Sequence, residues 1–386
     1  MTGPPPGAPP TPASTPSDRA YFDHAGLGRL RPVAAAAMRS ALDDALPHGS
    51  AGVGSLFPAR AAARRSAAAL LGCTPDEVAF VPNTSTGIHL VADGLDWRPG
   101  DRVVVFDRDF PANVRPWQRL ERHGVRLSWV PMREGGYRLE DVADAIGPAA
   151  RLVAVSHVNF ATGFRLDLDA VCALAARAGA LVCVDAVQSL GALPLDVAAT
   201  PVDFLAAGAH KWLCGPPGTG VFYCRADRLE LLRSTPTGWF GHEGAAEVSK
   251  GPGRLRYDLP ERAAAAKVEG GMYDLLGMAG LAAALAELTG VGIEAVADRV
   301  LRLASRVTAA AAGLGLPLVL GPDAPAASGI VALSRPGADG MRMAEKLISS
   351  GIQVSTADGV LRISPHYWTT DREIELLLGR LATLKP

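Results

Sequence analysis

The sequence predicts an α/β protein with a mainly parallel sheet and a smaller α+β domain at its C-terminal end, and three observations support this. Between residues 101 and 224, short apolar runs alternate with stretches of helical spacing. Several of these runs are nearly continuous, which is typical of strands covered on both faces of a sheet. At 386 residues, the chain exceeds what one hydrophobic core usually organises.

The expected elements follow from these patterns. Strands are expected at 77–81, 102–106, 126–130, 152–157, 181–184, 202–206 and 220–224. Helices are expected at 32–46, 58–71, 115–123, 139–146 and 168–178, with another beginning at 88. The C-terminal part is expected to hold helices at 278–288, 293–314, 341–349 and 370–384 and strands at 318–320, 330–333 and 360–363. The predicted organisation is a Pro-rich disordered tail (1–18), a large domain (19–290) and a small domain (291–386).

Composition excludes several classes of protein. Hydrophobic residues make up 48% of the chain and charged residues 20%, which is typical of a globular protein. A net charge of −1 gives no basis for binding nucleic acid or an anionic membrane. No apolar run is fit to span a bilayer, and five scattered cysteines form no C-x-x-C pair. We therefore expect reduced thiols and a cytoplasmic location.

His210-Lys211 is the most informative pair in the sequence. Lysine is rare in this chain, and Lys211 lies among small and apolar residues a few positions after the predicted strand at 202–206. Burial lowers the pKa of a lysine and makes its amine a nucleophile that can form a Schiff base. The alternative is a lysine whose stem is buried while its ammonium group reaches water. These neighbours alone leave both interpretations open.

A hydroxyl-rich turn follows the strand at 77–81. Thr84 and Ser85 stand where that strand passes into a helix, and Gly87 follows them. Free backbone N–H groups, the helix dipole and the side-chain hydroxyls would converge on one point there, which favours a phosphate site. A simple helix N-cap is the alternative, although it needs a single hydroxyl.

Further candidates lie after other strands, where ligands of α/β sheets collect. Asp185 ends the strand at 181–184, and Gln188 follows one turn later. A carboxylate there either caps a helix or pairs with a protonated ligand nitrogen. His157 ends another strand, and Phe110 lies in the loop after residue 106, where an aromatic side chain is most often a core residue.

Other motifs do not qualify. The Gly215–Gly220 stretch lacks the Lys-Ser/Thr pair of a nucleotide-binding loop, no G-x-S-x-G motif occurs, and no His/Cys set has zinc spacing. One ligand, pyridoxal 5′-phosphate (PLP), would use all the remaining candidates. Its phosphate needs the hydroxyl-rich turn, its ring nitrogen a carboxylate, its ring face an aromatic residue, and its aldehyde a lysine.

With these motifs, the sequence resembles the class V aminotransferase family of fold-type I PLP-dependent enzymes, which includes cysteine desulfurases, selenocysteine lyases, kynureninases and isopenicillin N epimerase-like proteins. The resemblance runs from about Tyr21 to Leu384 and is most specific at Val184-Asp185-Ala186-Val187-Gln188 and at His210-Lys211. It implies a fold-type I architecture, a PLP cofactor, an amino-acid-type substrate and a homodimer.

The resemblance also implies a role for each candidate. Lys211 would be the catalytic Schiff-base lysine, and Asp185 would pair with the ring nitrogen. Gln188 would bond the ring hydroxyl, and Phe110 would stack on the ring. The phosphate would be bound by Thr84, Ser85 and His210, and the substrate carboxylate by Arg362.

The chain departs from the family pattern at three places. Gly208 replaces the Ser or Thr that many members carry two residues before the histidine. Gly270-Gly271-Met272 stands where members often have a Gly-Thr pair that reaches the phosphate of the partner subunit. The short loop at 355–359 has no cysteine, whereas desulfurases carry one there.

The sequence thus predicts a PLP-dependent enzyme that acts at the α-amino carbon of an amino acid or aminoacyl-like substrate. The outcome could be transamination, elimination, epimerisation or decarboxylative deamination, because all share their first steps. The Phe110 loop is closest to kynureninase and epimerase-like members, which favours a biosynthetic role. A cysteine desulfurase or selenocysteine lyase is the alternative enzyme, and a PLP-binding protein without turnover is the alternative of another class.

Overall fold

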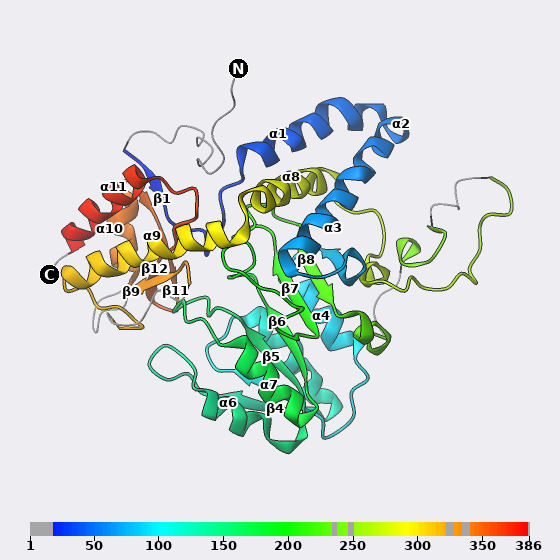
Figure 1. Ribbon diagram of the computed structural model, residues 1–386, viewed down its shortest axis with the longest axis horizontal. Helices are drawn as coiled ribbons and strands as arrows, with labels where there is room; N and C mark the ends of the chain where they lie inside the picture. The colour runs from blue at the N-terminus through cyan, green and yellow to red at the C-terminus, as the bar shows by residue number, and fades with distance from the viewer. Residues whose placement is uncertain (1–17, 234–237, 246–250, 322–327, 334–339, 385–386) are drawn as a thin grey trace.

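The large domain is built on a seven-stranded sheet with helices on both faces (Figure 1). The computed structural model describes residues 18–233, 238–245, 251–321, 328–333 and 340–384. The strand order is β2-β8-β7-β6-β5-β3-β4, and β8 runs in the direction opposite to the other six strands. The strands are β2 (Val78–Val81), β3 (Arg102–Phe106), β4 (Arg126–Val130), β5 (Ala150–Ser156), β6 (Leu181–Asp185), β7 (Phe204–Gly208) and β8 (Gly220–Cys224).

Apolar clusters bury both faces of this sheet, as the continuous strand patterns predict. Residues of α3 (Phe57–Leu71), α6 (Leu139–Ile146), α7 (Leu168–Ala178) and α8 (Leu275–Val291) contribute to the cluster on one face. The other cluster includes residues of α4 (Thr84–Gly94). Helix α4 lies so close to β7 that a Cβ on Gly87 would stand 2.6 Å from the Cβ of Ala206.

The small domain contains a three-stranded antiparallel sheet of β9 (Val331–Leu333), β11 (Ser355–Ala357) and β12 (Val360–Ile363). Helices α10 (Gly340–Ser349) and α11 (Asp371–Leu381) pack with it in a separate apolar cluster. The expected strand at 318–320 is wrong, because Leu318 forms a single bridge to Leu333. Pro317 before it lacks an N–H donor, and Gly321 after it turns the chain at a φ of 81°.

Two segments connect the domains. Strand β1 (Ala20–Tyr21) pairs with β10 (Ile352–Gln353), so the start of the described chain packs with the C-terminal part. Helix α9 (Ile293–Gly313) buries Val296 and Val300 in the large domain and its later residues in the small domain. The expected boundary at 290 therefore falls just before a helix that both cores share. The expected Pro-rich tail, apart from Asp18, lies outside the described residues.

The first helix is shorter than expected. Helix α1 (Pro32–Ser40) gives way to a π-helical turn at Ala41–Ala45 and a 3₁₀ turn at Leu46–His48. Pro47 limits a regular continuation because it lacks the N–H donor. Among the described residues, no single helix has the length and apolarity to cross a membrane. Helices α8 and α9 meet that test only together, and they are bent by 84° at their junction.

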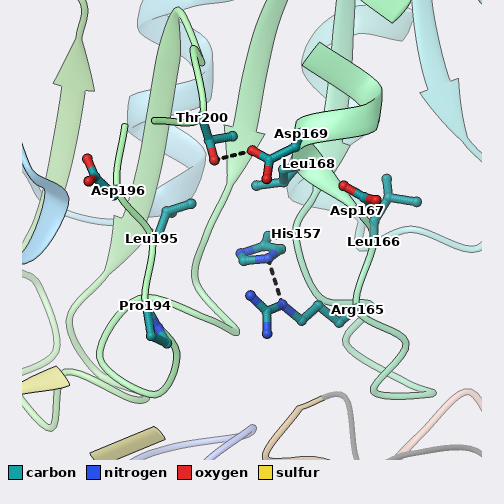
Figure 2. A pocket seen from close by; sticks show the side chains of 10 residues that line it. All are labelled: His157, Arg165, Leu166, Asp167, Leu168, Asp169, Pro194, Leu195, Asp196 and Thr200. Atoms are coloured by element: carbon teal, nitrogen blue, oxygen red, sulfur yellow. Dashed lines mark hydrogen bonds between the residues drawn. The ribbon is translucent and has the colours of Figure 1, made fainter. Parts of the chain in front are cut away.

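His157, one of the polar residues at strand ends, faces a cavity of about 370 Å³ between the start of α7 and residues 194–200 (Figure 2). Its Nε2 accepts a hydrogen bond from Arg165 Nε at 3.2 Å. Burial, with a smaller effect of the Arg165 charge, lowers the pKa of His157 to about 3. His157 therefore stays neutral and holds the chain after β5, and it lies apart from the other candidates.

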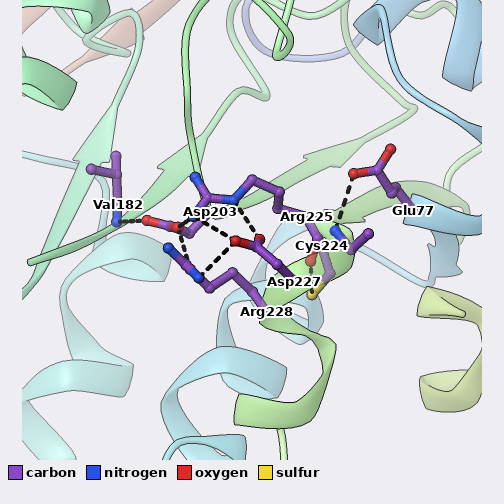
Figure 3. Close-up of polar contacts among 8 residues, drawn as sticks. Glu77, Val182, Asp203, Cys224, Arg225, Asp227 and Arg228 are labelled. Atoms are coloured by element: carbon purple, nitrogen blue, oxygen red, sulfur yellow. Dashed lines mark hydrogen bonds and ion pairs between the residues drawn. The ribbon is translucent and has the colours of Figure 1, made fainter. Parts of the chain in front are cut away.

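Asp203, just before β7, links the neighbouring strands β6, β7 and β8 through its side-chain contacts (Figure 3). Its buried carboxylate accepts a hydrogen bond of 2.7 Å from Val182 N–H on β6. Arg225 and Arg228, just after β8, donate to Asp203 at 2.9 and 2.8 Å. Both arginines also contact Asp227, whose side chain is 61% exposed.

We expect Asp203→Ala to destabilise the protein by about 2–4 kcal/mol, because it leaves the buried Val182 N–H without its acceptor and both arginines without their buried carboxylate. Asp227→Ala is the matched control, because it removes an exposed carboxylate from the same two arginines. Asp227→Ala should lower the free energy of unfolding by no more than about 1 kcal/mol. Urea unfolding of both variants at one protein concentration measures the difference. Equal destabilisation by the two would contradict the role of Asp203.

Candidate active site

The predicted site residues meet in one cavity of about 360 Å³ at the carboxyl ends of the parallel strands. Most of its polar lining comes from four segments of both domains and consists of Asn83, Thr84, Ser85, Asp185, His210, Lys211 and Arg362. Its remaining lining is Ala25, Gly26, Phe110, Ala112, Phe160, Val187, Thr356 and Ala357. Seven of the eight predicted site residues thus lie together, and Gln188 is the exception.

Lys211 follows β7 and lies against an N-terminal segment of the chain. The N–H of Gly28 donates to His210 O at 2.7 Å, and a Cβ on Gly28 would clash with the carbonyl oxygen of Lys211. Burial lowers the pKa of Lys211 to about 8. The charges of Asp185 and Asp23 raise this pKa, and that of Arg362 lowers it. A large fraction of the amine is therefore neutral and nucleophilic near pH 8.

Asp185 is the last residue of β6, and its side chain is almost fully buried. Its Oδ1 accepts a hydrogen bond from Val187 N–H at 2.9 Å. Burial raises the pKa of Asp185 to about 7, while the Val187 bond and the charge of Lys211 lower it. A buried carboxyl with one neutral hydrogen bond is suited to a cationic partner inside the cavity.

Thr84, Ser85 and His210 surround the N-terminus of α4. Thr84 is buried, and its hydroxyl oxygen accepts from Gly208 N–H at 2.9 Å, which leaves its own O–H free to donate. The His210 ring occupies the space beside Gly208, where an added Cβ would stand 2.8 Å from His210 Cε1. The ring therefore takes the volume that a Ser or Thr side chain would need at position 208. Together with the helix N-terminus, these groups offer several hydrogen-bond donors suited to an anion, and we call them the anion site.

Phe110 is not a core residue, because 41% of its surface is exposed and it lines the cavity. Its ring meets the ring of Phe160 edge to face at a centroid distance of 5.1 Å. The Nζ of Lys211 lies 5.5 Å from the Phe110 centroid. An aromatic face therefore stands beside the nucleophilic amine.

Arg362 projects from β12 and brings a cation from the small domain into the cavity. Its guanidinium donates to Phe160 O and to Ser355 Oγ, each at 2.8 Å. Asp23 Oδ1 stands 4.0 Å from Arg362 Nη2. Burial lowers the pKa of Arg362, whereas the Asp23 charge raises it.

Gln188 is buried beside the cavity and does not line it. Its Nε2 donates to Ala25 O at 2.9 Å, and its Oε1 accepts from Trp212 Nε1 at 2.8 Å. One amide hydrogen remains for another acceptor. Met272, in the segment expected to reach a partner subunit, is 62% exposed and also lies outside the cavity lining.

Sequence reasoning missed several residues of the site. Asp23 lies near Arg362, Phe160 packs on Phe110, and Thr356 and Ala357 form the wall on the small domain. The extended run before Gly26 contains Asp23, but nothing local indicates that it returns to a strand some 340 residues away. These contacts are products of tertiary folding.

The fold and this cavity define a PLP-dependent enzyme of fold type I. The lysine, the buried carboxyl, the anion site and the aromatic face supply the complement that this cofactor requires. A family model for class V aminotransferases matches residues 44–377, and the chain belongs to that family.

Individual relatives agree with this assignment. The chain is 32% identical to a probable cysteine desulfurase of Methanothermobacter thermautotrophicus, over 80% of both proteins. It is 30% identical to the isopenicillin N epimerase of Amycolatopsis lactamdurans, over 82% of this chain and 83% of that protein. A solved complex of the cystine C–S lyase C-DES with cysteine persulfide superposes with a TM-score of 0.86 at 27% identity, covering 96% of this chain and 98% of that one.

We expect the reactivity of Lys211 in the cofactor-free protein to follow its lowered pKa. Arylation by 1-fluoro-2,4-dinitrobenzene, a reagent that does not titrate in this range, should rise with pH and level off a little above pH 8, because the neutral amine is the reactive form. Peptide mapping by mass spectrometry measures the profile. Asp185→Asn should move its midpoint to lower pH, because the Asp185 charge raises the Lys211 pKa. A rate that keeps climbing through pH 10 would show that Lys211 is not desolvated.

Proposed function

We propose that Lys211 binds PLP covalently and transfers the proton at the α-carbon of an amino-acid substrate. The observation that supports this most strongly is the lowered pKa of Lys211, about 8, in a cavity that also holds Asp185, the anion site and Arg362. When bound, the cofactor supplies an electron sink that weakens the bonds to the substrate α-carbon.

Each residue then has a defined task. Asp185 would keep the ring nitrogen protonated, which suits a carboxyl that has no cation in hydrogen-bonding contact. The phosphate would be held by Thr84, Ser85, His210 and the first N–H groups of α4. Phe110 would cover the ring face, and the remaining amide hydrogen of Gln188 would reach the ring hydroxyl. Lys211, once released by the incoming amine, would act as general acid and base.

The reaction outcome is set by what happens after the proton leaves the α-carbon. The Phe110-Pro111-Ala112-Asn113 loop and the similarity to an isopenicillin N epimerase support a specialised biosynthetic role. Incubation with a panel of amino acids in deuterated water tests the function at its first step. Exchange of the α-hydrogen that Lys211→Ala abolishes would support it. Absence of exchange with every amino acid would contradict it.

Arg362 is proposed to bind the substrate carboxylate with its planar fork. We expect Arg362→Lys to weaken amino-acid binding by about 1–3 kcal/mol, because the charge remains but the paired donors are lost. Cofactor absorbance should not change. Arg165→Lys, which alters an exposed arginine in the separate cavity, is the control and should leave binding unchanged. Loss of cofactor in Arg362→Lys would mean that Arg362 has a structural role instead.

Cysteine desulfuration is the second candidate, because a desulfurase is among the relatives. That chemistry needs a mobile, exposed thiolate near the substrate. All five cysteines fall within the described residues, and none lines the cavity. Cys214, three residues after Lys211, is buried, and burial raises its pKa to about 12. Residues 355–359, at the wall of the cavity, contain no cysteine.

We therefore expect Cys214→Ser to keep its activity on the true substrate within about twofold, a change below 0.5 kcal/mol. Turnover by the variant and the unmutated protein, assayed together for ammonia, keto acid and sulfide, gives the comparison. Abolished activity together with a persulfide trapped on Cys214 of the unmutated protein would establish the desulfurase reaction.

We also propose that the protein is a homodimer in the cytoplasm. The exposed apolar side chain of Met272 supports the dimer, because it offers a surface that a second subunit could cover. Light scattering of the PLP-saturated protein tests this, and an active monomer would contradict it. Five unpaired cysteines support a reducing compartment, which fractionation of the source cells tests.

A further inference from the structure

The cavity has one wall from each domain, and an ion pair joins the two walls. Phe110 and Ala112 belong to the loop after β3, whereas Ala357 ends β11. Arg108 precedes Phe110 by two residues, and Asp358 follows Ala357 directly. Arg108 Nη1 and Asp358 Oδ2 stand 3.0 Å apart, with side chains 63% and 56% exposed. The pair therefore closes the space between two segments that line the site.

Backbone conformation fixes both partners. Asp358 and Gly359 form the two-residue turn between β11 and β12, with φ of 49° and 75°, as Asp-Gly hairpin turns do. Arg108 has a φ of 54°, which is uncommon for a residue with a side chain. Its carbonyl accepts a hydrogen bond of 3.2 Å from the buried Asn159. The ion pair is therefore positioned by two constrained turns.

Inside the cavity, the part left for a substrate side chain is mainly apolar. In the proposed function, most polar lining residues serve the cofactor or the substrate carboxylate, and Phe110 covers the ring. The lining that remains is Ala25, Gly26, Ala112, Phe160, Val187 and Ala357, together with the polar Asn83 and Thr356. Arg108 and Asp358 do not line the cavity themselves, but both are exposed side chains beside segments that do, so a long substrate side chain would meet them only at the rim.

We propose that Arg108 and Asp358 determine substrate specificity by keeping the rim of the substrate pocket electrically neutral, so that the enzyme prefers amino acids with uncharged side chains. This inference rests on the proposed function. While paired, the two charges nearly cancel, and the rim attracts neither anionic nor cationic side chains. Removing one partner exposes the charge of the other and should create a preference for the opposite sign.

The test uses three unbranched amino acids of similar length: glutamate, methionine and lysine. Their dissociation constants are measured by equilibrium dialysis in the PLP-saturated Lys211→Ala background, where the amino acid is not consumed. With Lys211 present, kcat/KM for the same amino acids gives a second readout. Arg108→Gln and Asp358→Asn remove one charge each, and asparagine tolerates the φ of the turn.

We expect the unmutated rim to favour methionine. Arg108→Gln should raise the affinity for lysine relative to that for methionine by up to about fivefold and lower the affinity for glutamate, because Asp358 is then unpaired. Asp358→Asn should do the reverse. Both preferences should shrink in 1 M salt, which screens exposed charges. Arg133→Gln, which breaks an exposed ion pair with Asp141 away from the cavity, should change none of these ratios.

Equal changes for all three amino acids in both variants would overturn the proposal and show that the pair is merely structural. Failure of the unmutated protein to bind any amino acid would instead overturn the proposed function, and the proposal with it. The two failures are thus distinguishable.

Discussion

The contact between the N-terminal segment Asp23–Gly28 and the ends of the parallel strands is the constraint on which the site depends. Gly28 packs against the backbone of Lys211 so closely that no side chain fits there. Ala25 accepts a hydrogen bond from the Gln188 amide, which fixes that side chain beside Asp185. A segment from the start of the described chain thus positions the lysine and the amide that follow two different strands.

The same segment attaches the small domain. The N–H of Ala25 donates to Ser364 Oγ at 2.9 Å, and His24 Nδ1 lies 3.0 Å from the Ser364 carbonyl oxygen. Arg362 precedes Ser364 by two residues, and Asp23 stands beside it. The segment Asp23–Gly28 therefore contacts both Lys211 of the large domain and Arg362 of the small domain, and it fixes their relative positions. Movement of the small domain would alter the distance between the Lys211 amine and the Arg362 guanidinium.

The sequence predicted the fold, and seven of the eight candidate site residues that it indicated line one cavity, because both leave local signals. The strands at 102–106, 126–130 and 220–224 were predicted with their correct bounds, because continuous apolar runs end at turn residues there. Asp185 and Lys211 were singled out because a charged residue at or shortly after the end of a buried strand is conspicuous. The pairing of Arg362 with Asp23 and that of Phe110 with Phe160 could not be predicted. Residues far apart in sequence meet only through the tertiary fold, and no periodicity records such meetings.

The pKa shifts at Asp185 and Lys211 explain why this site should bind its cofactor near neutral pH. The raised pKa of Asp185 means that the folded protein loses stability as pH rises from about 3.8 to about 7. The lowered pKa of Lys211 means that it loses stability as pH falls from 10.5 to about 8. Between pH 7 and 8 both costs are present, offset in part because each charge favours the other. A ligand that places a cation against Asp185 and turns the Lys211 amine into a covalent bond relieves both costs at once, so its binding should be most favourable in that window.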